Sequence, residues 1–170
     1  LSTMMIPFHV TLIPQYIVFQ KVGWVDSFKP LVVPAFFGGG AYNVFLLRQF
    51  FMTIPLEMDD AARIDGCSTF QIYLRIILPM ARPALATVAI FTFMGQWNSF
   101  LGPLIYLDNP EKHTIAIALS YFHQGGGYMP ERTWAHVMVL SLVTILPCLL
   151  LFFFAQRTFI QGVVISGVKG

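Results

Sequence analysis

The sequence predicts an all-α fold, a polytopic bundle of transmembrane helices with one orderly polar loop between its spans. Composition is the first observation: of 170 residues, 56% are hydrophobic and 11% are charged, and the mean hydropathy is +0.71. An average soluble domain has about 25% charged residues, and so short a chain has no core that could hide this much apolar surface. The second observation is that the apolar residues gather in long segments. Because lipid cannot hydrogen-bond to the backbone, such segments cross a bilayer as helices.

Charge, cysteines and histidines narrow the function classes. The formal net charge of +2 is too small to indicate a nucleic-acid partner. Cys67 lies in a polar stretch and Cys148 in an apolar run, so we expect free thiols at different depths. The histidines are scattered along the chain, and we expect no metal site. The pattern of a signal peptide is not visible, and we expect that the N-terminal spans of a longer protein are missing.

Four apolar segments are the expected spans. They cover about residues 4–19, 31–47, 84–107 and 134–155. The first segment is the weakest because Pro7 and Pro14 interrupt it. Three consecutive glycines at 38–40 in the second segment allow either close helix packing or local unwinding. The third and fourth segments reach the roughly 20 apolar residues that a spanning helix needs.

The connections between these spans are expected to alternate between the two sides of the membrane. Residues 21–30 and 108–133 lie on one side, and residues 48–83 and the tail from 156 lie on the other. The second side holds six of the 10 cations, namely Arg48, Arg63, Arg75, Arg82, Arg157 and Lys169. The positive-inside rule therefore predicts that residues 48–83 are cytoplasmic.

Residues 55–83 are charged and regular in pattern, and they begin with a helix signal. Pro55 has a φ suited to a first helical turn. Asp59 and Asp60 place negative charge near the N-terminus of that helix, where the helix dipole favours it. Gly66 suits the left-handed position that follows a helix. The pattern predicts a short helix that ends in a bend at Gly66.

A second short helix is predicted directly after the bend. Ser68 and Gln71 fit a capping box, in which each side chain bonds to the backbone of the other residue. An apolar face follows at helical spacing, made of Phe70, Tyr73, Leu74 and Ile77. Pro79 is expected to end this helix and Pro83 to open the next span.

The first of these two helices has features of a docking surface. The small side chains of Ala61 and Ala62 permit the close approach of another surface. Three carboxylates, those of Asp59, Asp60 and Asp65, are available to a basic partner. A hairpin that lies on the chain's own bundle explains the same residues, so both interpretations stay open. No His or Cys stands at metal-ligand spacing from the aspartates, and no glycine-rich phosphate loop is present in the sequence.

One motif in this stretch has a fixed spacing. It consists of Asp60-Ala61-Ala62, three residues, Gly66, nine residues, and Ile76-x-Leu78-Pro79. It resembles the motif E-A-A, three residues, G, nine residues, I-x-L-P in the cytoplasmic loop of permease subunits of binding-protein-dependent ABC importers. The one departure is Asp60 in place of glutamate, which keeps the charge and shortens its reach by one methylene.

Other stretches resemble the carbohydrate-uptake subfamily of these permeases. They are residues 48–66, 91–107, 109–119 and 151–170. The C-terminal stretch is similar to the second, maltose-type permease subunit, the partner with the shorter external loops. The resemblance implies that residues 1–170 are one partial type-1 transmembrane domain, the last four of about six spans, with residues 55–83 as its coupling loop.

The resemblance also implies partners, and it implies that this chain is not itself an enzyme. ATP and Mg²⁺ would bind to a dimer of partner ATPase subunits below the coupling loop, and this chain would hold no cofactor. A second permease subunit and an external solute-binding protein would complete the transporter in the bacterial inner membrane. The ATPase contact would fall on the motif and its neighbours, Asp59, Asp60, Ala61, Ala62, Asp65, Gly66, Ile76, Leu78 and Pro79.

A polar, aromatic patch interrupts the third apolar segment. It consists of Gln96, Trp97, Asn98 and Ser99. Amides and aromatic faces often hold sugars, so these residues are candidates for lining a translocation pathway. Alternatively they lie near a helix end and satisfy one another.

A sugar or sugar-like solute is the expected cargo of such a permease. Glycerol phosphate or a polyamine, carried by the same mechanism, stays open. A fragment of a secondary carrier is disfavoured because the third and fourth segments hold no charged residues for ion coupling. A purely structural membrane subunit does not explain the spacing of the loop motif.

Overall fold

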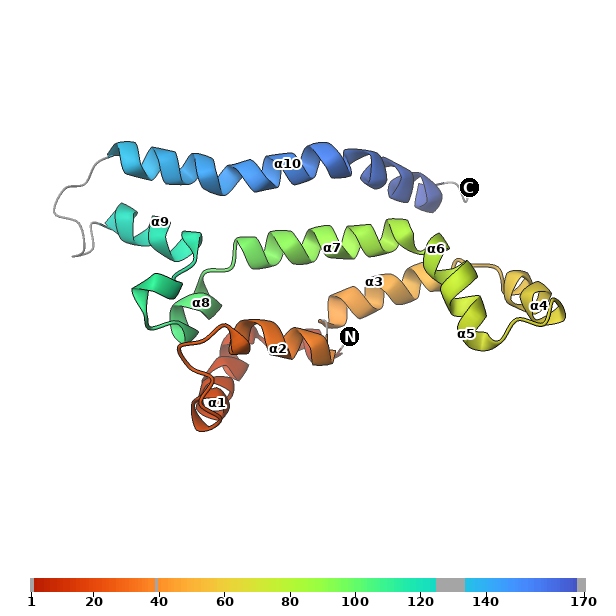
Figure 1. The fold of residues 1–170 in the computed structure, drawn as a ribbon, viewed down its shortest axis with the longest axis horizontal. Coiled ribbons are helices and arrows are strands. Elements are labelled where there is room, and N and C mark those ends of the chain that lie inside the picture. Colours follow the sequence, from red (N-terminus) through yellow and green to blue (C-terminus); the bar gives the residue numbers. More distant parts are fainter. Residues whose placement is uncertain (1, 39, 125–133, 168–170) are drawn as a thin grey trace.

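A computed structural model describes residues 2–38, 40–124 and 134–167, and every regular element in these ranges is a helix (Figure 1). In chain order they are η1 (Ser2–Met5), α1 (Phe8–Lys21), α2 (Lys29–Gly38), α3 (Ala41–Phe51), α4 (Leu56–Ile64), α5 (Thr69–Ile72), the π-helix η2 (Tyr73–Ile77), α6 (Leu78–Met80), α7 (Arg82–Trp97), α8 (Leu101–Tyr106), η3 (Pro110–Lys112), α9 (Ile115–Gln124) and α10 (Trp134–Gly167). The predicted all-α fold class is confirmed.

The last predicted span is the clearest. Within α10, Trp134–Gln156 forms 23 residues of apolar helix, about 35 Å at 1.5 Å per residue, which exceeds the roughly 30 Å hydrocarbon core of a bilayer. Pro147 lies inside this helix. No residue of its most apolar window is buried within the chain. The helix therefore presents apolar surface to lipid or to other helices rather than to a core of its own.

The second predicted span is interrupted. Lys29–Phe51 is long and apolar enough to cross a membrane, but it consists of two helices, α2 and α3. Gly40 stands before α3 with φ +81° and ψ 130°, a conformation that an L side chain rarely adopts. Of the two expectations for the glycines at 38–40, local unwinding is what the structure shows at Gly40.

The prediction of one helix over residues 84–107 is wrong. Helix α7 ends at Trp97, and a separate short helix, α8, begins at Leu101. The Asn98 side chain donates to the Met94 carbonyl at 2.8 Å, a local bond that competes with the helical pattern. Pro103 has no N–H, so it could not satisfy the Ser99 carbonyl in a continuous helix.

The first predicted span is the shortest in the structure. A 3₁₀ turn, η1, precedes α1, which starts after Pro7 and runs through Pro14. Its 14 residues extend about 21 Å, less than the hydrocarbon core. As the proline pattern indicates, this is the weakest of the four segments.

The helices run back and forth between two ends of the molecule (Figure 1). Helix α7 lies between α10 and α3 and contacts both. At one end the chain forms α4, α5 and α6. At the other end, the connection before α2 meets residues 108–112, where the Asp26 side chain accepts hydrogen bonds from the backbone N–H groups of Asp108 and Asn109. The structure thus brings together residues 21–30 and the described part of 108–133, the two connections expected on one side; residues 125–133 lie outside the described residues.

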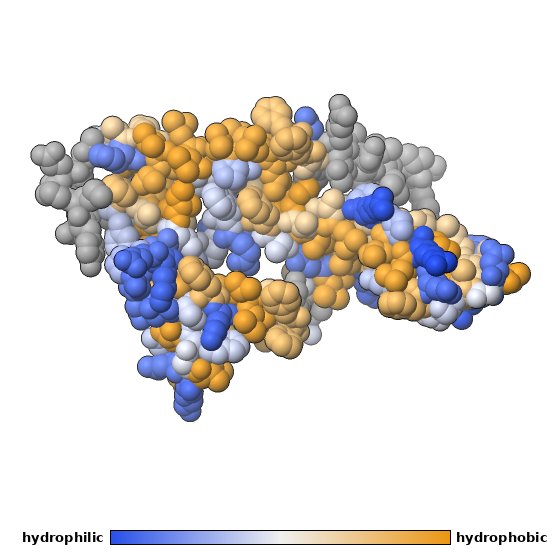
Figure 2. All heavy atoms as spheres, in the orientation of Figure 1, coloured by the Kyte–Doolittle hydropathy of each residue, from blue (hydrophilic) through white to orange (hydrophobic). Residues whose placement is uncertain are grey.

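Few side chains are buried. The buried apolar residues in the described part of the chain are Ala62, Ile72, Ala81, Ala84, Tyr106, Leu107, Ile117 and Ala155. Large apolar side chains cover much of the visible surface of α10, α7 and α2 (Figure 2). Water would oppose so much exposed apolar area, so the fold is consistent with a lipid environment.

Candidate functional site

The motif region forms a capped hairpin of helices, residues 56–80, that projects from one end of the molecule (Figure 1). Its first helix, α4, begins after Pro55, which adopts φ −61° and ψ 135° as the N-cap and thus stands one residue before the predicted first turn. Glu57 and Asp59 lie in the first turn, where the helix dipole favours negative charge. Asp59 Oδ2 also accepts from Arg63 Nε at 3.1 Å, one turn along the helix.

The bend at Gly66 is a complete C-terminal cap. The Gly66 N–H bonds to the Arg63 carbonyl and the Cys67 N–H bonds to the Ala62 carbonyl, each at 3.0 Å, the bond pair of a Schellman motif. Gly66 has φ +80°, and a Cβ added there would meet nothing within 4 Å. The glycine is therefore required for its backbone conformation and not for space, as the sequence predicts.

The second helix begins with the predicted capping box. The Ser68 N–H donates to Gln71 Oε1 at 2.8 Å, and the Gln71 N–H donates to Ser68 Oγ at 3.4 Å. Two adjacent caps, within residues 62–71, satisfy free backbone groups at both sides of the bend. Helices α4 and α5 contact each other, and Ala62 and Ile72, one from each, are buried. The hairpin is thus fixed internally rather than held by the rest of the chain.

The prediction that Pro79 ends the second helix is wrong. Helical structure continues from Thr69 to Met80, through the π-helix η2 and the short α6. Within it the Leu78 N–H reaches back five residues to the Tyr73 carbonyl. A π turn is wider than an α turn and gives room for the ring of the following Pro79, which would otherwise clash with the carbonyl four residues earlier.

A sharp elbow joins the hairpin to α7. The axes of Thr69–Met80 and Arg82–Trp97 differ by 68°, and Ala81, between them, is fully buried. Pro83 stands in the first turn of α7, as predicted. The half-buried side chains of Ile76, Leu78 and Pro79 lie near this elbow, away from α4. The structure therefore divides the motif into a helical tip, 60–66, and an elbow, 76–79.

One side of the tip is exposed. Leu56, Asp60 and Ile64 recur every four residues on α4, and we call them the outer face of α4. Leu56 is 78% exposed and Ile64 is 86% exposed. Asp60 lies between two apolar side chains that have no cover within the described residues. In the sequence, Leu56 and Ile64 alternate with the charges at roughly helical spacing, but they are not among the predicted contact residues.

The remaining predicted contact residues differ in their availability. Ala61, Asp65 and Gly66 are exposed, and Asp59 is half-buried and bonded to Arg63. Ala62 is only 4% exposed because it faces into the hairpin. Of the two alanines of the motif, Ala62 thus serves the internal packing and Ala61 is free to meet another surface. The predicted apolar face with Phe70 and Tyr73 is also largely exposed.

The polar patch at the C-terminal end of α7 has hydrogen-bond partners for two of its side chains. Trp97 Nε1 donates to the Thr144 carbonyl of α10 at 2.9 Å, and its ring stacks on Phe93. Asn98 bonds to the Met94 carbonyl, as described above. The Ser99 backbone N–H bonds to the Gln96 carbonyl at 3.1 Å, while the Gln96 side chain is exposed.

A second polar contact crosses between spans and was missed by the sequence analysis. Asn43 Nδ2 of α3 donates to Thr92 Oγ1 of α7 at 3.2 Å. Thr92 and Gln96 are one turn apart on α7, and both are exposed. The sequence shows a polar residue in each of two apolar segments, Asn43 and Thr92, but it does not show that their side chains are hydrogen-bonded.

One aspartate, Asp26, joins two chain segments at the end opposite the hairpin. Asp26 Oδ1 accepts from the Asp108 and Asn109 N–H groups at 3.1 and 2.9 Å, and Asp26 Oδ2 pairs with Lys112 Nζ at 2.6 Å. These bonds to Lys112 and then to the Asn109 amide lower the pKa of the Asp26 carboxyl. Asp26 has φ +57°, a conformation that Asp and Asn tolerate better than most residues.

Comparisons with known proteins agree with this architecture. A family described as binding-protein-dependent transport system inner membrane component matches residues 2–164. An arabinooligosaccharides transport system permease protein of Halalkalibacterium halodurans is 36% identical over 100% of this chain and 59% of its own length. An sn-glycerol-3-phosphate transport system permease protein of Pectobacterium atrosepticum is 35% identical over 96% of this chain and 57% of its own length.

A lactose transport system permease protein of Rhizobium radiobacter is 33% identical over 95% of this chain and 57% of its own length. The chain thus spans 57–59% of the length of these three curated relatives.

Proposed function

Because this chain belongs to the family of binding-protein-dependent transport system inner membrane components, we propose that it forms the last four spans of a permease subunit in an ATP-driven importer. The proposed cargo is a sugar or a sugar-like solute. The proposed partners are a second permease subunit, an ATPase dimer and an external solute-binding protein. The proposed location is the bacterial inner membrane, as the family description indicates for its members.

Relatives and span composition support a neutral cargo. Two similar permeases are named for arabino-oligosaccharides and lactose, and one for sn-glycerol-3-phosphate. Residues 84–107 and 134–155 contain no Asp, Glu, Lys or Arg. A phosphate-bearing solute in a low-dielectric pathway calls for a cation. Glycerol phosphate is therefore the second candidate. The similarity to an sn-glycerol-3-phosphate permease favours it, whereas the absence of charged residues from these two segments does not.

The observation that carries the proposal is the capped hairpin with an exposed outer face on α4. Leu56 and Ile64 offer apolar anchors and Asp60 offers a charge between them, the mixture that a specific protein contact uses. We propose that this face docks on the partner ATPase, which binds ATP and Mg²⁺ and carries out hydrolysis. This chain supplies motion and not catalysis.

Force would pass from the tip to the spans through the elbow. The Schellman motif at Gly66 and the capping box at Ser68 keep α4 and α5 from moving independently. A displacement of α4 would therefore turn the helix Thr69–Met80 as a unit about buried Ala81 and move α7. Ile76, Leu78 and Pro79, which lie near that elbow, act in this proposal as its support rather than as ATPase contacts.

For the pathway, we propose the face of α7 with Thr92 and Gln96, together with Asn43 of α3. Asn43 and Thr92 bond across two spans, and Gln96 is exposed one turn away. Exposed polar groups are costly against lipid and useful beside a hydrated sugar. Trp97 and Asn98, which bond to backbone carbonyls, and the adjacent Ser99 border this face at the helix end.

The deciding experiment uses the full-length protein, co-purified with its partner ATPase and reconstituted in vesicles. A binding protein loaded with sugar should stimulate ATP hydrolysis and sugar uptake together. Gly66→Pro should abolish uptake while the chain still inserts, because proline fixes φ near −65° and Gly66 has φ +80°. A secondary carrier or a structural subunit would show uptake or assembly with no dependence on the binding protein, and that result would exclude the proposal.

A further inference from the structure

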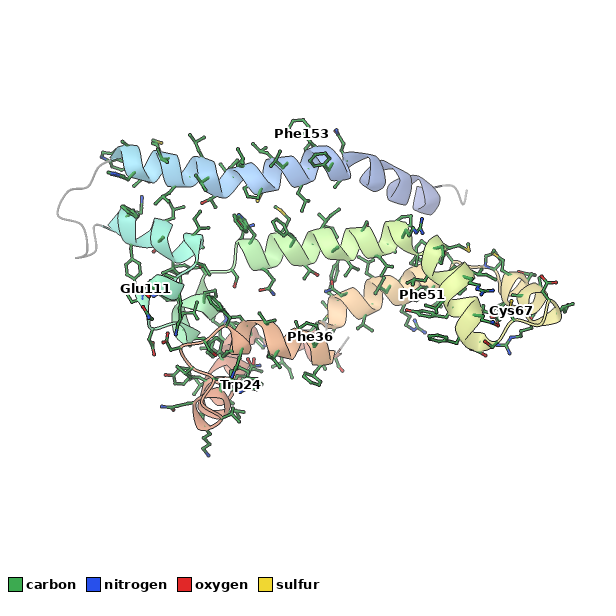
Figure 3. All side chains as sticks on the ribbon, in the orientation of Figure 1. Trp24, Phe36, Phe51, Cys67, Glu111 and Phe153 are labelled. Carbon is green, nitrogen blue, oxygen red and sulfur yellow. The ribbon has the colours of Figure 1, made fainter. Side chains whose placement is uncertain are left out.

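The last turns of α3 border two apolar grooves that share an arginine. The larger groove, about 640 Å³, is lined by Phe51, Ile54 and Leu56, among others, and reaches the start of the hairpin. A second groove of about 420 Å³ is lined by residues of α3 alone. Val44 and Arg48 line both grooves. Both volumes fall within the range of small-molecule sites, although these grooves are open on one side. Phe51 lies at the end of α3 nearest to the hairpin (Figure 3).

Arg48 is a cation without a carboxylate partner at this place. Among the side chains that the structure describes, in residues 2–37, 40–123 and 134–156, the ion pairs are Arg63 with Asp59 and Lys112 with Asp26, and Arg48 takes part in neither. Its side chain is exposed, one turn before the end of the apolar stretch Lys29–Phe51. A cation at the end of a span lies at the depth of lipid headgroups.

We propose that this surface binds an anionic phospholipid, with its phosphate on the Arg48 guanidinium and an acyl chain in the smaller groove, which lies along the apolar part of α3. The planar guanidinium matches phosphate oxygens, and the apolar walls match a hydrocarbon chain. A soluble phosphate would leave those walls exposed to water, so the lipid is the occupant that both features fit. The inference goes beyond the proposed transport function and needs only that α3 ends at a bilayer surface.

The test measures lipid retained by the full-length protein in its assembled transporter. The purified complex in detergent is given equal amounts of phosphatidylglycerol and phosphatidylcholine with identical acyl chains, and native mass spectrometry counts each bound lipid. Wild type should prefer phosphatidylglycerol. Arg48→Gln should lower that preference about fivefold, the effect of one cation at an anionic lipid surface, and Arg48→Lys should keep most of it.

Two matched variants separate charge from shape. Lys21→Gln removes an exposed cation at the end of α1 and should leave the preference unchanged. Val44→Trp fills the space shared by both grooves and should lower the retention of both lipids. Size-exclusion profiles establish that each variant is assembled. If Val44→Trp does not fold, the lipid preference of Arg48→Gln, a surface change, tests the proposal by itself.

Three results would overturn the proposal. The first is equal preference in wild type and Arg48→Gln. The second is a wild type that retains neither lipid, because another protein segment then fills the grooves. The third is displacement of phosphatidylglycerol by inorganic phosphate at low concentration, because the site would then recognise a free anion.

Discussion

Asp60 carries a charge on a helix face whose other members are apolar. Leu56 and Ile64 flank it at intervals of four residues, and all three are exposed. In the family motif that this stretch resembles, glutamate occupies the position, so Asp60 presents the same charge with one methylene less reach. An exposed charge contributes little on its own surface but sets register when a partner removes the water around it.

We predict that Asp60→Ala weakens retention of the partner ATPase about tenfold, equivalent to about 1.4 kcal/mol, because the docked face loses its one charge. Asp60→Glu keeps that charge and should retain the ATPase nearly as well as wild type. Glu111→Ala removes an exposed carboxylate at the opposite end of the molecule and serves as the control (Figure 3). Equal retention by Asp60→Ala and Asp60→Glu in a pull-down would argue against the contact.

At the level of elements, the hairpin is stiff because its bend is capped on both sides. The Cys67 N–H bonds back to Ala62 only if Gly66 keeps its left-handed conformation. A Cβ at Gly66 would find open space, so any cost of Gly66→Ala comes from the backbone alone. The effect of Gly66→Ala therefore reports on the backbone conformation alone, without a contribution from a steric clash.

We predict that Gly66→Ala raises local opening of the bend roughly fivefold, because a left-handed alanine costs about 1 kcal/mol. Hydrogen exchange of the Cys67 amide measures that opening. Gly66→Asn should exchange more slowly than Gly66→Ala, since asparagine tolerates the conformation. Gly95→Ala in α7, another glycine with open space but helical backbone, should leave the bend unchanged. Unchanged exchange in Gly66→Ala would mean that the cap does not hold the bend.

The two caps and the elbow differ in how far the sequence predicts them. Gly66 and the Ser68–Gln71 pair were predicted correctly because all the atoms of each cap lie within six residues. The end of α7 at Trp97 was missed because the outcome depends on a competition between the Asn98 side chain and the backbone. The passage of the helix through Pro79 was missed because a π turn has no local signal in the pattern.

The sequence did not predict which side chains of distant segments contact each other. Asn43 and Thr92 are 49 residues apart, and Asp26 and Lys112 are 86 apart. Hydrophobic periodicity predicts which segments are spans but carries no information on which polar side chains meet. The candidate pathway face and the grooves beside Arg48 therefore came from the fold, whereas the tip proposed to dock on the ATPase came largely from the motif.

At the scale of the whole molecule, the chain is anchored at the end opposite the hairpin. Asp26 joins the connection before α2 to the segment after α8, and the Asp26 N–H also bonds to the Tyr106 carbonyl at 2.8 Å. Buried Tyr106 and Leu107 lie at the same end, and the Tyr106 ring stacks on Tyr16 of α1. If the hairpin moves α7, this anchored end is the natural fixed point against which the spans turn.

We predict that Asp26→Asn and Lys112→Met each lower the melting temperature of the assembled protein, and that combining them adds little to either alone, because both remove the same ion pair. Asparagine keeps an oxygen for the Asp108 and Asn109 amides and tolerates φ +57°, so it removes the charge alone. Additive effects of the two substitutions would show that the side chains act separately.

The same pair predicts a direction for pH. The pKa of Asp26 is lowered in the folded protein from its usual 3.8, so its contribution to stability is fully present above that value and disappears as the pH falls through the lower folded value. The difference in melting temperature between wild type and Asp26→Asn should therefore be constant from pH 5 to 7.5 (roughly the range in which unfolded aspartate is ionised) and shrink only in stronger acid. A difference that already vanishes near pH 6 would place the responsible proton on a histidine and not on Asp26.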